Sequence, residues 1–297
     1  MAATRRLREL ADSALTRTRF PSGSVTVALS GGADSAALAV LAIQSGLEVS
    51  LFHVHHGFDA SDMLAAAASE VADRLGIALE TVSVAVGEGA SLEAQARDAR
   101  YGALTKVDGP VVTGHTRDDA VETMLINLVR GTGADGLTGI PYHRRPNVYR
   151  PILDVSRSET REIAALADLP FRDDPANESL DLTRNRIRHV VLPRLRELNP
   201  NLDETMARAA SALRSDRDLL DEMADGALSD EMETSVITTL PSPIADRVVK
   251  RWLAAHDVEV SADAVARVWS VVSGDSDRQE LDRGRSVVRD RAVIRVE

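Results

Sequence analysis

Residues 25–35, VTVALSGGADS, decide the fold that we expect for this chain. Residues 25–29 form a short apolar run rich in β-branched side chains, and residues 34–44 have the alanine and leucine content of a helix. A Ser-Gly-Gly turn joins the two. In this order, backbone N–H groups at the positive end of the helix can approach a phosphate. The stretch therefore predicts a phosphate-binding turn, and a tight turn without a ligand is the alternative.

The residues expected to bind the phosphates are Ser30, Gly31, Gly32, Ala33, Asp34 and Ser35. The serine hydroxyls add donors to those of the backbone. The carboxylate of Asp34 fits an anion-binding loop if a cation such as Mg²⁺ joins it to the phosphates. The loop lacks the Gly-Lys-Ser/Thr ending of a Walker loop, so it belongs to another class.

The composition is that of a soluble globular protein, with 44% hydrophobic and 27% charged residues. A chain of 297 residues is long enough for two domains. No window approaches an uninterrupted apolar stretch of about 18 residues, and no signal-peptide pattern follows the N-terminus, so we expect a cytoplasmic protein without a membrane span. The absence of cysteine excludes disulfides, thiolate metal sites and cysteine nucleophiles.

Strands alternate with helices through the first half of the chain. Further strands are expected at residues 49–54, 78–84 and 110–113, and helices at about 62–75, 92–106 with Ser91 as its cap, and 115–130. The spacing of Ser156 and Glu159 is that of a capping box, which predicts a later helix that ends at about residue 169. This order predicts a Rossmann-like parallel sheet with helices on both faces. Ligands bind beyond the carboxyl ends of such strands, so the loops 30–35, 53–57 and 114–119 should meet.

The segment TGHTRDDAVET, residues 113–123, places three carboxylates near the start of a helix. Asp118, Asp119 and Glu122 are three and four residues apart, so they cluster on one side. The apolar residues expected to form the opposite, buried stripe are Met124, Leu125, Leu128 and Val129. Acids in a first helical turn are also favoured by the helix dipole alone. The position after a strand favours a functional role.

Two segments supply further candidates. Arg130, Gly131 and Gly133 belong to RGTGADGL, whose G-x-G-x-x-G follows a helix and therefore predicts a flexible, anion-friendly loop rather than a dinucleotide fingerprint. Arg184 and Arg188 share one face of a helix expected at about 184–198, bent at Pro193, with Asn185 beside Arg188. Guanidinium groups suit phosphate, although a solvated charged face is the alternative.

The chain changes character near residue 200. Helices are expected at about 203–225, 243–256 and 262–272, followed by a terminal hairpin. We therefore expect a catalytic domain at residues 1–200 and a smaller, mainly helical substrate-binding domain at 201–297. The net charge of −11 argues against indiscriminate nucleic-acid binding, yet residues 183–196 carry five arginines and no acid. A local basic patch can exist on this acidic chain.

Six segments together resemble one family. The loop SGGADS looks like the signature of the N-type ATP pyrophosphatases, which split ATP to adenylate an oxygen. The order SGGADS, HVHHG, TGHTRDDAVET, RGTGADGL, RPILDVSR and DDPAN followed by TRNRIRH resembles the tRNA(Ile)-lysidine synthases over about residues 20–200. The resemblance implies ATP-dependent adenylation of the C2 oxygen of the wobble cytidine in a CAU-anticodon isoleucine tRNA. The ε-amine of free lysine then attacks C2 and expels AMP.

The resemblance also implies roles for the candidates. The 30–35 loop, with His53 and His115, binds ATP, and Asp34 with Asp118 or Asp119 holds Mg²⁺ or the reacting groups. Glu122 orients the lysine or the metal. The residues expected to contact phosphates or developing negative charge are Arg130, Arg184, Asn185 and Arg188, with Gly131 and Gly133 beside the substrate.

The sequence departs from the family pattern at two places and leaves alternatives open. Family members commonly have glutamine where Ala120 stands and a second histidine where Thr116 stands. The three histidines of HVHHG would suit a metal, but recognisable zinc-ligand spacing is lacking. A tRNA thiolase is the nearest rival and generally needs cysteines, which are absent. A small-molecule adenylating ligase and a non-catalytic RNA-binding relative are further alternatives, and a homodimer is one assembly left open.

Overall fold

A computed structural model describes residues 2–57, 59–85 and 92–297 and divides the chain into two compact units, Met1–Ser211 and Ala212–Glu297. The helix expected at 92–106 is present, whereas its expected cap, Ser91, lies outside the described residues. The helices of the first unit are α1 Ala2–Leu15, α2 Ala33–Gln44, α3 Asp59–Leu75, α4 Leu92–Leu104, α5 Arg117–Val129, α6 Ala134–Leu137, α7 Arg157–Leu166, α8 Thr183–Arg186 and α9 Leu192–Leu198.

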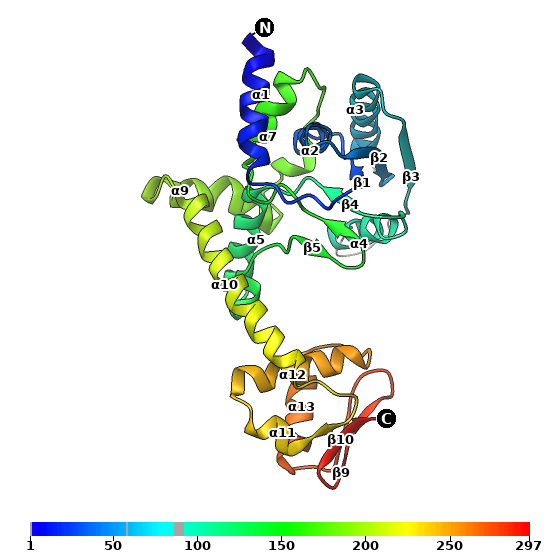
Figure 1. The fold of residues 1–297 in the computed structure, drawn as a ribbon, viewed down its shortest axis with the longest axis vertical. Helices are drawn as coiled ribbons and strands as arrows, with labels where there is room; N and C mark the ends of the chain where they lie inside the picture. Colours follow the sequence, from blue (N-terminus) through cyan, green and yellow to red (C-terminus); the bar gives the residue numbers. More distant parts are fainter. Residues whose placement is uncertain (1, 58, 86–91) are drawn as a thin grey trace. The chain divides into compact units, whose positions relative to one another are not determined.

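The first unit is built on a six-stranded sheet. Its strands are β1 Ser24–Ala28, β2 Glu48–His55, β3 Leu79–Ser83, β4 Val111–Thr113, β5 His143–Arg144 and β6 Val148–Tyr149. They lie in the order β3-β2-β1-β4-β6-β5, and all neighbours are parallel except β5 and β6 (Figure 1). The predicted parallel sheet is confirmed, while the short antiparallel edge strand was not foreseen.

Helices cover both faces of this sheet because its central strands are apolar on both sides. Val27 and Leu51 face a core shared with α1, α2, α3 and α7. Phe52, which follows Leu51 in β2, and Val111 of β4 pack on the other face with Tyr101 of α4. A side chain changes face at each step along a strand, so two buried faces require the near-continuous apolar runs seen in the sequence.

The expected helix at 184–198 is present with a change of pitch inside it. Between α8 and α9, residues Ile187–Val191 form one π-helical stretch, and Pro193 stands in the first turn of α9. The N–H of Leu192 donates to the Ile187 carbonyl five residues earlier, and Pro193, which follows it, has no N–H to donate. The expected buried stripe on α5 is partly wrong, because Leu128 is 57% and Val129 77% exposed. The described structure leaves the end of α5 uncovered.

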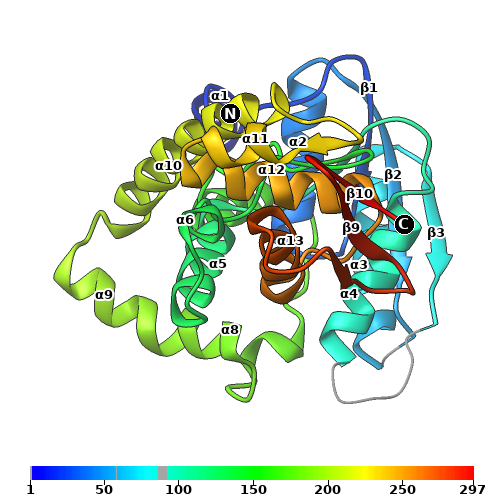
Figure 2. The same cartoon turned by 90° about the horizontal axis from the view of Figure 1, so that it is seen from below.

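The second unit combines helices with a small antiparallel sheet. α10, Leu202–Asp225, enters it, followed by α11 Thr234–Thr239, α12 Ser242–Ala255 and α13 Ala262–Ser273. Its strands are β7 Met232–Glu233, β8 Arg278–Glu280, β9 Ser286–Asp290 and β10 Val293–Val296, in the order β7-β10-β9-β8. Figure 2 shows β9 beside β10. The core surrounds Trp252, which is fully buried. The predicted terminal hairpin is confirmed as β9 and β10.

Among the described residues, none of the helices is both long and apolar enough to cross a bilayer.

Candidate active site

The predicted phosphate-binding loop follows β1 and closes on itself through Ser35. The Oγ of Ser35 accepts from the Ser30 N–H and hydroxyl, both at 3.0 Å, and donates to the Gly32 carbonyl at 2.9 Å. Gly32 is the N-cap of α2, and no described side chain caps this helix end. The first-turn amides of α2 are therefore available to an anion.

Two glycines allow other segments to approach this loop closely. Gly31 has a φ of +84°, and a Cβ there would lie 2.2 Å from the carbonyl oxygen of Leu64 in α3. At Gly114, after β4, a Cβ would lie 2.9 Å from the carbonyl carbon of Asp34. Backbone contact at this distance admits only glycine. The loops after β1 and β4 therefore meet, as expected.

Asp34 points from this loop toward α7. Its Oδ1 accepts from the hydroxyl of Thr160, and its Oδ2 lies 3.7 Å from Nε of Arg157. Burial raises the pKa of Asp34 to about 6, and the negative charge of Asp119 adds to the rise. Asp34 therefore gains from a positive ligand that replaces the missing solvation.

The start of α7 is held rigidly by a capping box. Ser156 accepts from the N–H of Glu159, and Glu159 accepts from the Ser156 N–H, as predicted. Arg17, which follows α1, adds an ion pair of 2.6 Å to Glu159. Burial opposes ionisation of Glu159, but these donors outweigh it and lower its pKa to about 2. This charged cap fixes Arg157 and Thr160 in the first turn.

Asp119 and Glu122 form the centre of a buried ionic cluster with three arginines. Oδ1 of Asp119 lies 2.8 Å from Arg157 and 3.0 Å from Arg184. Glu122, which is fully buried, receives Arg184 at 2.8 Å and Arg188 at 2.6 Å. Burial alone would raise the pKa of Asp119, but Arg157 and Arg184 hold it well below its usual range. Asp119 is therefore charged.

Asp118 points away from this cluster, although it is adjacent in sequence. It accepts from the backbone N–H of Arg157 at 2.8 Å and from Arg196 at 3.1 Å. Arg196 also contacts Asp203 in α10. Asp118 therefore connects α5 with α7 and, through Arg196 of α9, with α10. Its expected role beside Asp34 stays a prediction.

The two histidines expected at the nucleotide lie at the ends of β2 and β4. Nδ1 of His53 is 2.7 Å from the Leu29 carbonyl, and Nδ1 of His115 is 3.0 Å from the Thr113 hydroxyl. Burial lowers the pKa of both, so the imidazoles are neutral. His55 instead pairs with Asp62 at 2.9 Å, so His53 and His55 have separate partners.

Two further expectations fall outside the ionic cluster. Asn185 is buried, and its amide group donates to the carbonyls of Ala176 and Ser179, both at 2.8 Å, which joins α8 to the DDPAN segment. Arg130, Gly131 and Gly133 lie at the other end of α5. Eleven residues of helix between Asp119 and Arg130 span about 16 Å. The structure thus separates this loop from the carboxylates.

Arg157 and Thr160 are site residues that the sequence analysis missed. Arg157 reaches Asp34, Asp119 and Glu122 at once, at 3.7, 2.8 and 3.2 Å. The only sequence signal was the RPILDVSR segment and the capping box that opens α7. Neither states which carboxylates the arginine contacts.

A divalent ion fits Asp34 better than Asp119. Within the part of the chain that the structure describes, Oδ2 of Asp34 has no partner closer than Arg157 at 3.7 Å. Asp119 has both oxygens engaged, Oδ1 by arginines and Oδ2 by Thr116. The described residues contain no group of three or more carboxylate or imidazole side chains arranged for a metal. Asp34 would therefore share the ion with oxygens of a bound nucleotide.

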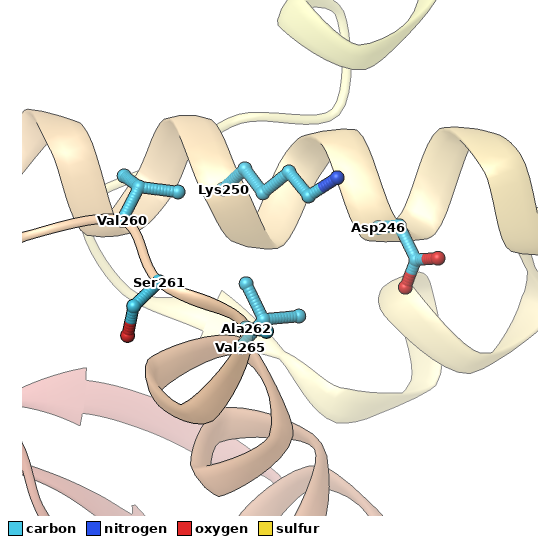
Figure 3. A pocket seen from close by; sticks show the side chains of 6 residues that line it. All are labelled: Asp246, Lys250, Val260, Ser261, Ala262 and Val265. Atoms are coloured by element: carbon cyan, nitrogen blue, oxygen red, sulfur yellow. The ribbon is translucent and has the colours of Figure 1, made fainter. Parts of the chain in front are cut away.

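A separate hollow of about 360 Å³ lies in the second unit (Figure 3). Its lining residues are Asp246, Lys250, Val260, Ser261, Ala262 and Val265. Asp246 already accepts from Nε1 of Trp269 at 2.8 Å. Lys250 alone cannot supply the paired carboxylates and arginines of the first unit, so we place the chemistry there.

Comparison with known proteins gives a family match that covers most of the first unit. Residues 2–195 match the PP-loop domain family. The tRNA(Ile)-lysidine synthase of Rhodococcus erythropolis is 40% identical over 259 residues, which cover 83% of this chain and 79% of the relative. That of Nocardia farcinica is 36% identical over 295 residues, covering 91% and 92%. That of Mycobacterium tuberculosis is 39% identical over 244 residues, covering 77% and 75%.

A solved structure shares the fold. The tRNA thiolase NcsA from Methanococcus maripaludis superposes with a TM-score of 0.52 at 17% identity, covering 71% of this chain and 78% of that one. This likeness concerns the fold alone. The matches along the sequence are more specific, and they include the segments that build the ionic cluster. The chain belongs to the PP-loop domain family and, within it, to the tRNA(Ile)-lysidine synthases.

Proposed function

We propose that this chain converts the wobble cytidine of a CAU-anticodon isoleucine tRNA into lysidine, with ATP and free L-lysine as the other substrates. The C2 oxygen of the cytidine attacks the α-phosphorus of ATP, and pyrophosphate leaves. The ε-amine of lysine then attacks C2. The bond from C2 to the adenylated oxygen breaks, AMP leaves, and the nitrogen gives up a proton.

The observation that carries this proposal is the juxtaposition of Asp34 with the Asp119–Glu122 cluster. One side offers free helix amides and a carboxylate with a raised pKa, which suit a phosphate chain with a divalent ion. The other side offers two carboxylates held by guanidinium groups, and carboxylates suit an amine. A ligase that joins an adenylated oxygen to an amine needs both sides within one site.

The arginines of the cluster supply the electrostatic part of this chemistry. Arg184 and Arg188 are held by Glu122, so their guanidinium groups do not have to reorganise during the reaction. Fixed donors stabilise charge that develops on phosphate oxygens better than mobile ones do. A Mg²⁺ ion at Asp34 would neutralise the charge on the leaving pyrophosphate. His53 and His115, both neutral, would face the nucleotide.

The remaining candidates concern the tRNA. We assign Arg130, Gly131 and Gly133 to contact with the RNA away from the reacting atoms, because they lie at the exposed end of α5. We also assign tRNA binding to residues 201–297, as expected from the sequence. We assign Asn185 a supporting role in the active site: it holds the DDPAN segment against α8 and does not itself touch the ligand.

The decisive experiment measures incorporation of radiolabelled lysine into a CAU-anticodon isoleucine tRNA in the presence of ATP and Mg²⁺. We expect ATP-dependent label in the RNA and one AMP released per lysine. A tRNA whose wobble cytidine is replaced by uridine serves as the control and should take up none. Absence of label with the cytidine-containing tRNA would refute the proposal.

A further inference from the structure

Arg157 occupies the space between the phosphate-binding loop and the carboxylates of α5. Its Nη2 lies 2.8 Å from Asp119, its Nη1 3.2 Å from Glu122 and its Nε 3.7 Å from Asp34. Among the described residues it is the only arginine paired with both the loop and the α5 carboxylates. It thus stands where the two halves of the proposed reaction must meet.

The carboxylates that would receive an amine are occupied in this arrangement. Oδ1 of Asp119 contacts Arg157 and Arg184, and its Oδ2 accepts from Thr116. Both oxygens of Glu122 accept from guanidinium groups. An ammonium group can therefore reach these oxygens only if an arginine gives up its contacts.

Arg157 differs from the other two arginines in how it is held. Arg184 and Arg188 rise from one helical segment and contact Glu122 together. Arg157 comes from a different element, α7, and Asp118 fixes its backbone N–H with a hydrogen bond of 2.8 Å. Its guanidinium can leave the carboxylates without moving its helix. Asp34, 3.7 Å from its Nε, marks the side on which the phosphates are expected.

We propose that Arg157 is a positioning residue that acts as a substitute cation: it holds Asp119 and Glu122 until the ammonium of the incoming lysine replaces it. Its guanidinium then turns toward the phosphate side of the site. This inference rests on the proposed function, because it names the amine substrate as the competing cation. The exchange keeps the two carboxylates neutralised throughout, which avoids leaving buried charges unpaired.

The test compares Arg157→Gln with the wild-type protein by calorimetric titration of L-lysine in the presence of Mg²⁺ and a non-hydrolysable ATP analogue. Loss of the competing cation should tighten lysine binding at least fivefold, while kcat for lysidine formation falls at least tenfold. Arg157→Lys keeps a positive charge that reaches one carboxylate at a time. Its affinity for lysine should therefore lie between that of the wild-type protein and that of Arg157→Gln. Arg161→Gln is the matched control. Arg161 lies one turn after Arg157 in α7, and it pairs with Asp173.

Unchanged or weaker lysine binding by a folded Arg157→Gln protein would overturn the inference. If Arg157→Gln does not fold, as judged by its thermal transition, Arg157→Lys carries the test, and lysine affinity no tighter than wild type overturns it. Lysine incorporation by the wild-type protein separates the two hypotheses. If the wild-type protein incorporates lysine but the variants bind lysine with unaltered affinity, only the role of Arg157 as a substitute cation is refuted. If the wild-type protein incorporates no lysine, the proposed function is refuted.

Discussion

Arg188 grips Glu122 with two nitrogens: Nε lies 2.6 Å from Oε1 and Nη2 lies 2.9 Å from Oε2. The pair joins residues 66 positions apart in the chain, and its carboxylate is inaccessible to solvent. Paired donors on both oxygens fix the orientation of the carboxylate as well as its charge. This ion pair ties the helix that follows β4 to the helix that carries the arginines.

Replacing Glu122 by glutamine should destabilise the protein as well as inactivate it. The change leaves Arg184 and Arg188 buried with less compensation, which costs about 3 kcal/mol or more in the free energy of unfolding. Urea denaturation at neutral pH measures this loss. Glu162→Gln, in an exposed pair with Arg6, should cost under about 1 kcal/mol. Equal losses in the two variants would contradict the arrangement.

The rate of pyrophosphate release should depend on the ionisation of Asp34. Because its pKa is raised to about 6, the ionised form that would hold Mg²⁺ is lost below that pH. We expect the rate to fall about tenfold per pH unit below 6 and to level off above 7. A pH–rate profile in single-turnover conditions measures this, and a flat profile between pH 5 and 7 would contradict it.

Asp34→Asn should abolish pyrophosphate release without weakening the fold. The folded-state pKa lies above the ordinary value of 3.8, so protonation of Asp34 contributes stability that is present below that value and lost as pH rises through 6. The uncharged asparagine should therefore give an equal or higher melting temperature at pH 8. Asp73→Asn, at an exposed position of α3, should change neither property. Normal turnover by Asp34→Asn would show that the metal lies elsewhere.

A methyl group at Gly114 should displace the phosphate-binding loop. The added Cβ would meet the backbone of Asp34 at 2.9 Å and of Ser35 at 3.0 Å, which cannot move as a side chain can. We expect a loss of about 1–3 kcal/mol in stability and at least tenfold weaker ATP binding. Gly102→Ala in α4 meets nothing within 4 Å and should stabilise the helix slightly. Fluorescent ATP analogues measure the affinity.

Arg130→Ala should separate RNA binding from nucleotide chemistry. Arg130 is exposed at the end of α5, so ATP affinity should remain at the wild-type value. If Arg130 contacts a phosphate of the tRNA, binding should weaken for all tRNA sequences. The slope of the logarithm of the binding constant against the logarithm of the salt concentration should become shallower by about one unit. Filter binding at several salt concentrations tests this. Arg8→Ala, exposed on α1, is the control.

The sequence was most informative where a property is local. Strand, turn and helix signals around the 30–35 loop predicted a turn that the structure contains, and the Ser156–Glu159 capping box was read directly from its spacing. Helix periodicity also placed Asp119 and Glu122 on one side of α5. Such features depend on residues within one or two turns of each other, so a single chain suffices to find them.

Contacts between distant segments could not be read in this way. Arg157 reaches Asp119 across 38 residues, and only the packing of α7 beside α5 decides which arginine meets which carboxylate. The same limitation explains the error at Leu128 and Val129: periodicity identifies an apolar face, but it does not show whether another element covers it. Asp118 likewise turned to Arg196, because its neighbours in space differ from those of Asp119.

The ion pair between Arg17 and Glu159 has a practical meaning for anyone preparing this protein. Arg17 pairs with Glu159 in the capping box that opens the helix bearing Arg157 and Thr160, so the segment after α1 helps to hold two residues of the site far along the chain. Trimming that leading helix to improve crystals, or loading it with a bulky purification tag, would be felt at Asp34. Tags belong at the other terminus.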